Sequence, residues 1–218
     1  MRILGTAAIA AMIACVIGTG VNAQDAMWAS APTADSWTGF YFGGQIGLVG
    51  MKSHEKGPAV PNGEALLGDI PVQAGVFGGF HWQQTDWWVW GLDAELNIEQ
   101  GEFFYNGSKF GSMEMDGAVR VQGGYLVAPN VLAYASVGYS WAHFDNRAYY
   151  GGGATGADFI GGGLQLGLGV DAMVTDTIMA RLQMTWAHYG EHAVSSGGGA
   201  ATSEPSMIDI RTGVAWKF

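Results

Sequence analysis

The sequence predicts an all-β fold: an eight-stranded antiparallel transmembrane β-barrel with short periplasmic turns and four longer external loops. Three observations carry this prediction. Apolar residues alternate with polar or small ones, the first residues have the layout of an export signal, and tryptophans gather at one chain reversal. A period of two sends alternate side chains to opposite faces of a strand, so each predicted strand has one apolar face and one face of ions or glycine.

Composition excludes several classes of protein. The 218 residues carry a formal net charge of −10, and 49% of them are hydrophobic while only 13% are charged. Such acidity argues against nucleic acid as a partner. The 9 Trp, 10 Phe and 8 Tyr, combined with so little charge, exclude a disordered chain. After the export signal, no segment supplies the roughly 18 uninterrupted apolar residues of a helical span, so the apolar material must be distributed over strands.

The first segment, residues 1–23, is predicted to be a secretory signal peptide. It has an early positive charge at Arg2, an apolar run through Ile17 and small residues before a cleavage site after Ala23. A lipoprotein signal at Cys15 is the alternative, although this cysteine interrupts the apolar run. Cleavage after Ala23 leaves a mature chain without cysteine, so the exported protein is expected to be stable without disulfides.

The rest of the chain divides into a flexible periplasmic lead, residues 24–36, and a barrel, residues 37–218. Turn signals between the alternating segments delimit the strands. The predicted strands are residues 38–52, 68–83, 87–103, 112–128, 131–146, 157–174, 178–192 and 206–218. Their number is even, as a bacterial single-chain barrel requires.

The connections between the predicted strands alternate in length. Three are short, at residues 84–86, 129–130 and 175–177. Four are longer and include glycine-rich stretches, at residues 53–67, 104–111, 147–156 and 193–205. Short periplasmic turns and long external loops produce this rhythm, and both ends of the barrel segment then lie on the periplasmic side. The external loops are the parts expected to meet a host or environmental ligand.

Aromatic placement favours a membrane barrel over a soluble β-sandwich, which shows the same alternation. Trp82 ends one predicted strand, and three further tryptophans begin the next one after a short turn. At a soluble surface this cluster would promote aggregation, whereas at a bilayer interface it forms an aromatic girdle. The predicted girdle comprises Trp82, Trp88, Trp90, Trp141, Trp186 and Trp216. His188 and His192 are assigned to its surroundings and not to a metal site, because four residues along a strand separate them by roughly 13 Å.

The polar faces predict a filled lumen, because eight strands leave room only for side chains. Counted from the short turns, Glu95 and Arg120 lie at nearly equal height, and Asp171 lies level with Arg181. Opposite charges in a narrow interior of low dielectric should pair, since either alone is costly to desolvate. The predicted lumen network comprises Glu95, Arg120, Asp171, Arg181, Asp209 and Arg211. The alternative is a narrow passage in which water separates and hydrates these charges.

Two stretches resemble a known family. The opening SWTGFYFGGQIG, residues 36–47, is similar to the first strand of the small outer-membrane surface-antigen (outer-membrane immunogenic protein) family of alphaproteobacteria, which is related to opacity proteins and OmpA-like barrels. The closing RTGVAWKF, residues 211–218, resembles the family's last strand. The resemblance implies that Val214, Trp216 and Phe218 are read by the barrel-assembly machinery, that outer-membrane lipid and lipopolysaccharide surround the barrel, and that no cofactor is needed. The second hairpin and the loops depart from the family pattern.

Three classes of function remain open from the sequence: a non-catalytic surface barrel that supports envelope integrity and presents its loops, a small-solute pore, and a lipid-modifying enzyme. The enzyme is disfavoured, because Tyr189 and Gly190 follow His188 where lipid A deacylases have His-x-Ser-Asn. Ser195 and Ser196 fall in a predicted glycine-rich loop that would not hold catalytic geometry. The sequence therefore assigns no catalytic, cofactor-binding or metal-binding residue.

Overall fold

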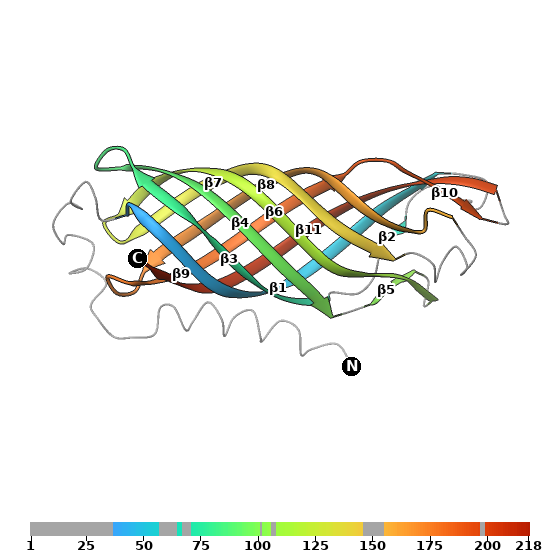
Figure 1. Ribbon diagram of the computed structural model, residues 1–218, viewed down its shortest axis with the longest axis horizontal. Coiled ribbons are helices and arrows are strands. Elements are labelled where there is room, and N and C mark those ends of the chain that lie inside the picture. Colours follow the sequence, from blue (N-terminus) through green and yellow to red (C-terminus); the bar gives the residue numbers. More distant parts are fainter. Residues whose placement is uncertain are drawn as a thin grey trace.

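The protein forms a closed antiparallel β-barrel, which confirms the predicted fold class (Figure 1). The computed structural model describes residues 37–56, 65–66, 71–100, 102–105, 108–145, 155–196 and 199–218. The predicted signal peptide, residues 1–23, and the predicted lead, residues 24–36, lie outside the described residues. In the described part of the chain, no helix has the length and apolar character needed to cross a membrane.

Eight long strands build the barrel wall and three short ones extend it. The long strands are β1 (Gly39–Lys56), β3 (Val72–Gln83), β4 (Trp88–Gln100), β6 (Ser108–Ala128), β7 (Val131–Asp145), β8 (Asp158–Met173), β9 (Ile178–Tyr189) and β11 (Gly199–Lys217). The short strands are β2 (Ala65–Leu66), β5 (Glu102–Tyr105) and β10 (His192–Ser196). Neighbouring strands are antiparallel throughout, and they cross the barrel at a steep tilt (Figure 1).

The ring closes where β11 pairs with β1. The register of this seam runs from Tyr41 opposite Lys217 to Lys56 opposite Thr202. At the periplasmic end, the backbone N–H of Phe218 donates to the Phe40 carbonyl at 2.9 Å. A closed ring pairs the backbone groups of every long strand on both sides, which is the condition for strands to lie in a bilayer.

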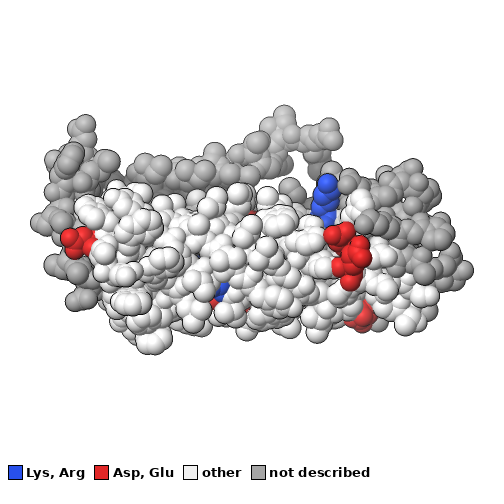
Figure 2. Space-filling view, turned by 90° about the horizontal axis from the view of Figure 1, so that it is seen from above, with Lys and Arg blue, Asp and Glu red and all other residues white. Residues whose placement is uncertain are grey.

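The wall is apolar outside and polar inside. On β9, Arg181 and Gln183 are buried in the lumen, whereas Leu182 and Met184 between them point outward and are about half exposed. This arrangement reverses that of a soluble protein and is typical of a barrel surrounded by lipid. The space-filling view shows the consequence as a broad band that is almost entirely white, with only a small charged spot near its middle and the larger charged patches toward the two ends (Figure 2).

Three strands, β1, β6 and β11, extend further on the external side than the alternation predicts. β1 continues through Lys56, four residues beyond its predicted end. The predicted loop at residues 193–205 contains most of β10 and the first part of β11, which pair from His192 opposite Ser203 to Ser196 opposite Gly199. Strand pairing continues in these polar segments because it satisfies the backbone N–H and C=O groups whether or not lipid covers the wall. Loop composition alone therefore underestimates the height of the barrel.

Candidate functional site

The lumen is filled by side chains in three layers. The layer near the short turns, here called the periplasmic plug, consists of Trp37, Tyr41, Phe77, Val89, Leu126, Leu132, Tyr134, Met179 and Ala215. The layer at the opposite end, the external plug, consists of Val49, Met51, Met113, Ala142, Phe144, Ala187, Tyr189 and Met207. Polar and charged side chains fill the lumen between the two plugs.

Trp37 lies at the periplasmic end of the periplasmic plug. From the sequence, this residue is predicted only to begin the barrel. Its side chain is 1% exposed, and its indole N–H donates to the Pro129 carbonyl at 3.1 Å. Its backbone N–H donates to Gln83 Oε1 at 3.1 Å. Tyr41, in the same plug, lies so close to Gly79 that a Cβ there would be 2.6 Å from the tyrosine hydroxyl. Glycine on the inner face thus makes room for the ring.

Between the plugs, seven charged side chains form one continuous chain of ion pairs. In order of contact they are Asp209, Arg211, Glu95, Arg120, Asp93, Arg181 and Asp171. Arg120 occupies the centre and contacts both Asp93 and Glu95, with its Nη2 2.7 Å from Glu95 Oε2. Glu95 in turn accepts from Arg211. Each of these side chains is almost fully buried.

The two ends of the chain repeat this arrangement. Arg181 lies 2.7 Å from Asp93 and 2.8 Å from Asp171, with its guanidinium also 4.5 Å from the centre of the Phe77 ring. At the other end, Arg211 Nε lies 2.7 Å from Asp209 Oδ1. Alternation of charge lets every arginine contact two carboxylates, which is how buried ions are tolerated in a medium of low dielectric.

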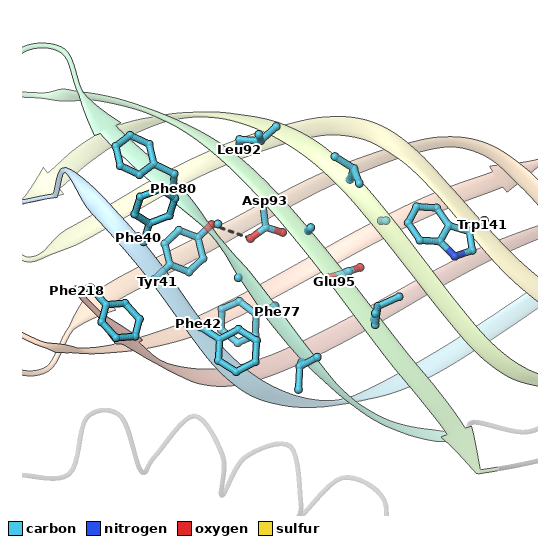
Figure 3. Close-up of a pocket in the computed structure, with 17 residues that line it drawn as sticks. Phe40, Tyr41, Phe42, Phe77, Phe80, Leu92, Asp93, Glu95, Trp141 and Phe218 are labelled. Atoms are coloured by element: carbon cyan, nitrogen blue, oxygen red, sulfur yellow. Dashed lines mark hydrogen bonds between the residues drawn. The ribbon is translucent and has the colours of Figure 1, made fainter.

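Neutral side chains complete the network. The Tyr41 hydroxyl donates to Asp93 Oδ2 at 2.7 Å (Figure 3). The Thr185 hydroxyl donates to Asp209 Oδ2 at 2.8 Å, and Arg120 Nη1 donates to Gln165 Oε1 at 3.2 Å. Such bonds occupy carboxylate and guanidinium groups that would otherwise lose their hydration without compensation.

The structure brings all six predicted lumen charges into this chain and adds one. Asp171 and Arg181 are direct cross-strand neighbours. Arg120, however, lies directly opposite Asp93, while Glu95 reaches it diagonally. Asp93 was missed because counting heights from the turns ignores the stagger between barrel strands. The signal was present in the period-two run Asp93, Glu95, Asn97 and Glu99 along β4.

The described lumen excludes water at the level of the charges. Asp93, Gln165 and Asp171 are 0% exposed, as is Ser140 nearer the external plug. A water-filled passage would wet these side chains. Their burial favours the plugged interior over the solvated alternative.

The tryptophans predicted for the girdle all lie on the outer face or at its rim. Trp82, Trp88, Trp90 and Trp216 lie near the end with the short turns, while Trp141 and Trp186 lie toward the external end. Five of the six side chains are about half exposed, and Trp141 is less so because its ring covers Gly117. The Trp90 indole N–H donates to Gln84 Oε1 at 2.9 Å, in keeping with a ring at a boundary between apolar and polar surroundings.

A shallow apolar hollow lies on the outer wall across β1, β3 and β4 (Figure 3). Its lining combines bulky side chains such as Phe40 with the small residue Gly78. Asp93 and Glu95 also belong to the lining, but their carboxylates point to the lumen, where they meet the arginines. The hollow therefore lies on the outer side of β4, whose inner side carries two carboxylates of the charge chain.

A β-bulge turns Glu114 to the outside of the barrel. The register of β6 against β7 shifts between Met113 and Met115, and Glu114 between them is exposed, although Asp116 and Arg120 at the following even-numbered positions face the lumen. Its carboxylate lies 3.2 Å from His143 Nδ1, and Asp158 lies 2.7 Å from His143 Nε2. Only the imidazolium can donate from both ring nitrogens, so this geometry suits a protonated histidine.

The other external histidines contact neighbouring side chains or backbone. His188 stacks on Trp186, with ring centres 6.0 Å apart, and its Nε2 lies 3.3 Å from Glu204. His192 lies 4.1 Å from the Phe159 ring centre, and partial burial there lowers the pKa of His192. Across the described ranges, no three His, Cys, Asp or Glu side chains form a group that could hold a metal ion.

Ser195 lies in a strand instead of the predicted loop. It belongs to β10, opposite Ala200 on β11, and its backbone is bonded in both directions to Thr155. The nearby His192 ring contacts the Ile160 carbonyl at 3.2 Å. In the described part of the chain, no hydrogen bond joins this serine to a histidine that would activate it.

A closed ring of antiparallel strands with an apolar outer face, aromatic rims and a filled polar interior defines an outer-membrane β-barrel. The chain belongs to the outer membrane protein beta-barrel domain family, whose model matches residues 11–218. It is located in the outer membrane, as its relatives are.

The relatives agree with this assignment over most of the chain. The 31 kDa outer-membrane immunogenic protein of Brucella melitensis is 25% identical, and the alignment covers 96% of this chain and 98% of the relative. The 22 kDa outer membrane protein of Rhizobium leguminosarum is 26% identical, over 85% of this chain and 80% of the relative. Among solved structures, OprG of Pseudomonas aeruginosa has the same fold, with a TM-score of 0.54 and 14% identity over 83% of this chain and 96% of that chain.

Proposed function

We propose that this barrel is a non-catalytic surface protein that contributes to envelope integrity and presents its external loops to the host or the environment. The observation that carries the proposal is the filled lumen, in which two apolar plugs enclose a network of buried ion pairs. A wall held together from inside suits a mechanical and display role better than transport. The designation of the Brucella relatives as immunogenic outer-membrane proteins supports surface display.

The expected partners of the barrel are assigned to its outer wall, its closing strand and its external loops. The apolar band is the surface for outer-membrane lipid and lipopolysaccharide, and the closing strand is the surface for the barrel-assembly machinery during insertion. Ligands of the host or the environment would meet the external loops. Nucleic acid is not among the expected partners, because the chain has a net charge of −10.

Conductance of the purified barrel in planar lipid bilayers tests the proposal against a small-solute pore. We expect no steady unitary current, because the charged layer is closed to water and covered by a plug on each side.

The contribution to envelope integrity is tested in cells. A strain without the protein should be more sensitive to detergent, and expression of the protein should restore resistance. In the conductance experiment, steady unitary currents would instead favour the small-solute pore.

Catalysis is tested separately by mass spectrometry of lipid A from strains with and without the protein. The proposal expects identical acyl chains in both strains. A reproducible difference in acylation that returns on complementation would show that the protein modifies lipid.

A further inference from the structure

Two buried carboxyl groups stand apart from the chain of ion pairs. Glu99 lies near the external end of β4 and Asp116 lies in the external half of β6, between the charge chain and the external plug. Asp116 is 0% exposed and is the cross-strand neighbour of Asn97. Glu99 is two residues further along the same inner face of β4, so it meets Asp116 diagonally. Neither residue belongs to the lumen network that the sequence predicts.

The two carboxyl groups are diagonal neighbours on the inner face of β4 and β6, because Asp116 lies opposite Asn97 and Glu99 is two residues further along β4. Asp116 Oδ2 accepts a bond from Asn97 at 3.0 Å, but Asp116 Oδ1 and both oxygens of Glu99 are buried without a donor among the described residues. An ionised carboxylate can only accept hydrogen bonds, whereas a protonated one can donate. A buried carboxyl group that accepts no hydrogen bond is more stable with a proton than as an ion, so one proton on this pair is favoured.

The surroundings supply no cation in place of that proton. The titratable or charged groups that face the pair are Glu95 on β4, Tyr189 on β9, and Asp209 and Arg211 on β11. Arg211 is the cation among them, and it already contacts Glu95, Asp209 and the Thr185 hydroxyl. The remaining faces are neutral, with Gln73 on β3 opposite Glu99 in register and Ser140 on β7.

Charge balance leads to the same conclusion. The described polar lumen holds six carboxyl groups and three guanidinium groups, and the chain of ion pairs uses all three guanidinium groups on four of the carboxyl groups. The two that remain are Glu99 and Asp116. Two like charges buried side by side disfavour ionisation of both groups. The nearby Gln73 amide, 1% exposed and without a partner among the described residues, further indicates a polar site that the ion pairs do not use.

We propose that Glu99 and Asp116 form a buried binding site for one proton, and that the shared proton holds the external end of the polar lumen closed. The external plug, which includes Tyr189 and Met113, packs over this site. Loss of the proton places two carboxylates against each other beneath an apolar layer, so the closed external end becomes less stable.

The proton is tested by the pH dependence of unfolding of the full barrel in detergent micelles. An unfolded chain releases carboxyl protons near pH 4, whereas the folded pair retains one. The folding equilibrium constant should therefore fall about tenfold per pH unit above pH 4, until the folded pair also ionises. In Glu99→Gln and Asp116→Asn, the new amide N–H donates to the remaining carboxylate and replaces the proton, so this slope should disappear. Asp176→Asn, in an exposed turn, is the matched control and should keep it.

Infrared spectroscopy of the folded wild-type protein provides a second readout that does not depend on folding of the variants. We expect the C=O stretching band of a protonated carboxyl group to persist at neutral pH and to be absent from Glu99→Gln. Absence of this band in the wild type, or a wild-type stability that does not change with pH, would overturn the proposal. Stabilisation at alkaline pH by sodium or calcium chloride, but not by choline chloride, would show a metal cation at the site and would also overturn it.

Discussion

At the scale of single residues, the lumen is organised by where each charge finds its partners. Arg120 contacts two carboxylates that are themselves bonded to further arginines, so no member of the chain can change without affecting its neighbours. A buried ion pair often adds little stability compared with well-packed apolar residues, but removal of one partner leaves the other charge buried and uncompensated. The contribution of this network to stability is therefore measured best by removing one of its charged side chains.

Replacement of Arg120 with Ala should lower the free energy of unfolding by about 3–5 kcal/mol, because it leaves Asp93 and Glu95 with one guanidinium each in place of two. Urea unfolding of the refolded barrel in micelles measures the change. His143→Ala, which removes ion pairs on the outer surface, is the control and should cost about 1 kcal/mol or less. Equal effects of the two substitutions would contradict the buried network as a source of stability.

At the scale of strands, the seam between β1 and β11 decides whether the wall is a ring or a sheet with two open edges. Val214 and Trp216 on the outer face of β11, and Phe218 directly after its end, alternate along the chain and are all more than half exposed. Between them, Ala215 belongs to the periplasmic plug and Lys217 lies on the inner face. The outer face of β11 is thus available to another protein until the seam forms, and we propose that the assembly machinery reads it.

Deletion of Phe218 should reduce the amount of barrel in the outer membrane far more than it reduces the stability of barrel refolded in detergent. Phe218 makes one backbone bond to Phe40, and its ring is 74% exposed, so few contacts within the folded wall are lost. Fractionation of cells, together with urea unfolding in vitro, measures the two quantities. Normal outer-membrane yield of the shortened protein would refute the recognition signal.

The same comparison of strands shows what the sequence could predict. The eight long strands and their order follow from the period of two and the turn signals, because side-chain alternation is a local property. Register is not local, since it depends on how the whole ring is staggered. This is why Asp93 opposite Arg120, and the pair of Glu99 with Asp116, could not be derived by counting from turns. The bulge at Glu114 was equally invisible, because it reverses the alternation at a single position.

At the scale of the whole molecule, the barrel is a polar core inside an apolar sleeve. The sleeve lies between two zones of tryptophan and tyrosine, with charged side chains beyond it (Figure 2). Its position in the membrane follows from these zones, since aromatic rings collect at the bilayer interfaces. Leu168 then lies near the middle of the bilayer, and Val174, in a periplasmic turn, lies at its edge.

Replacement of Leu168 with Arg should therefore destabilise the folded barrel in lipid by about 2–4 kcal/mol, whereas Val174→Arg should cost about 0–1 kcal/mol. Both side chains point outward, so the pair isolates membrane depth from packing. Reversible unfolding from lipid vesicles measures the difference. Equal costs at the two positions would show that the apolar band does not lie in the membrane at this height.

The closed seam has a consequence for the order of the chain itself. Because Phe218 is bonded to Phe40 at one rim, a short linker could join the two ends of the barrel segment, and the turn at residues 175–177 could be opened in exchange. Such a circular permutant would retain each pair of neighbouring strands, because a ring has no first member. The architecture is set by which strands are neighbours, and the place where synthesis begins is a separate matter.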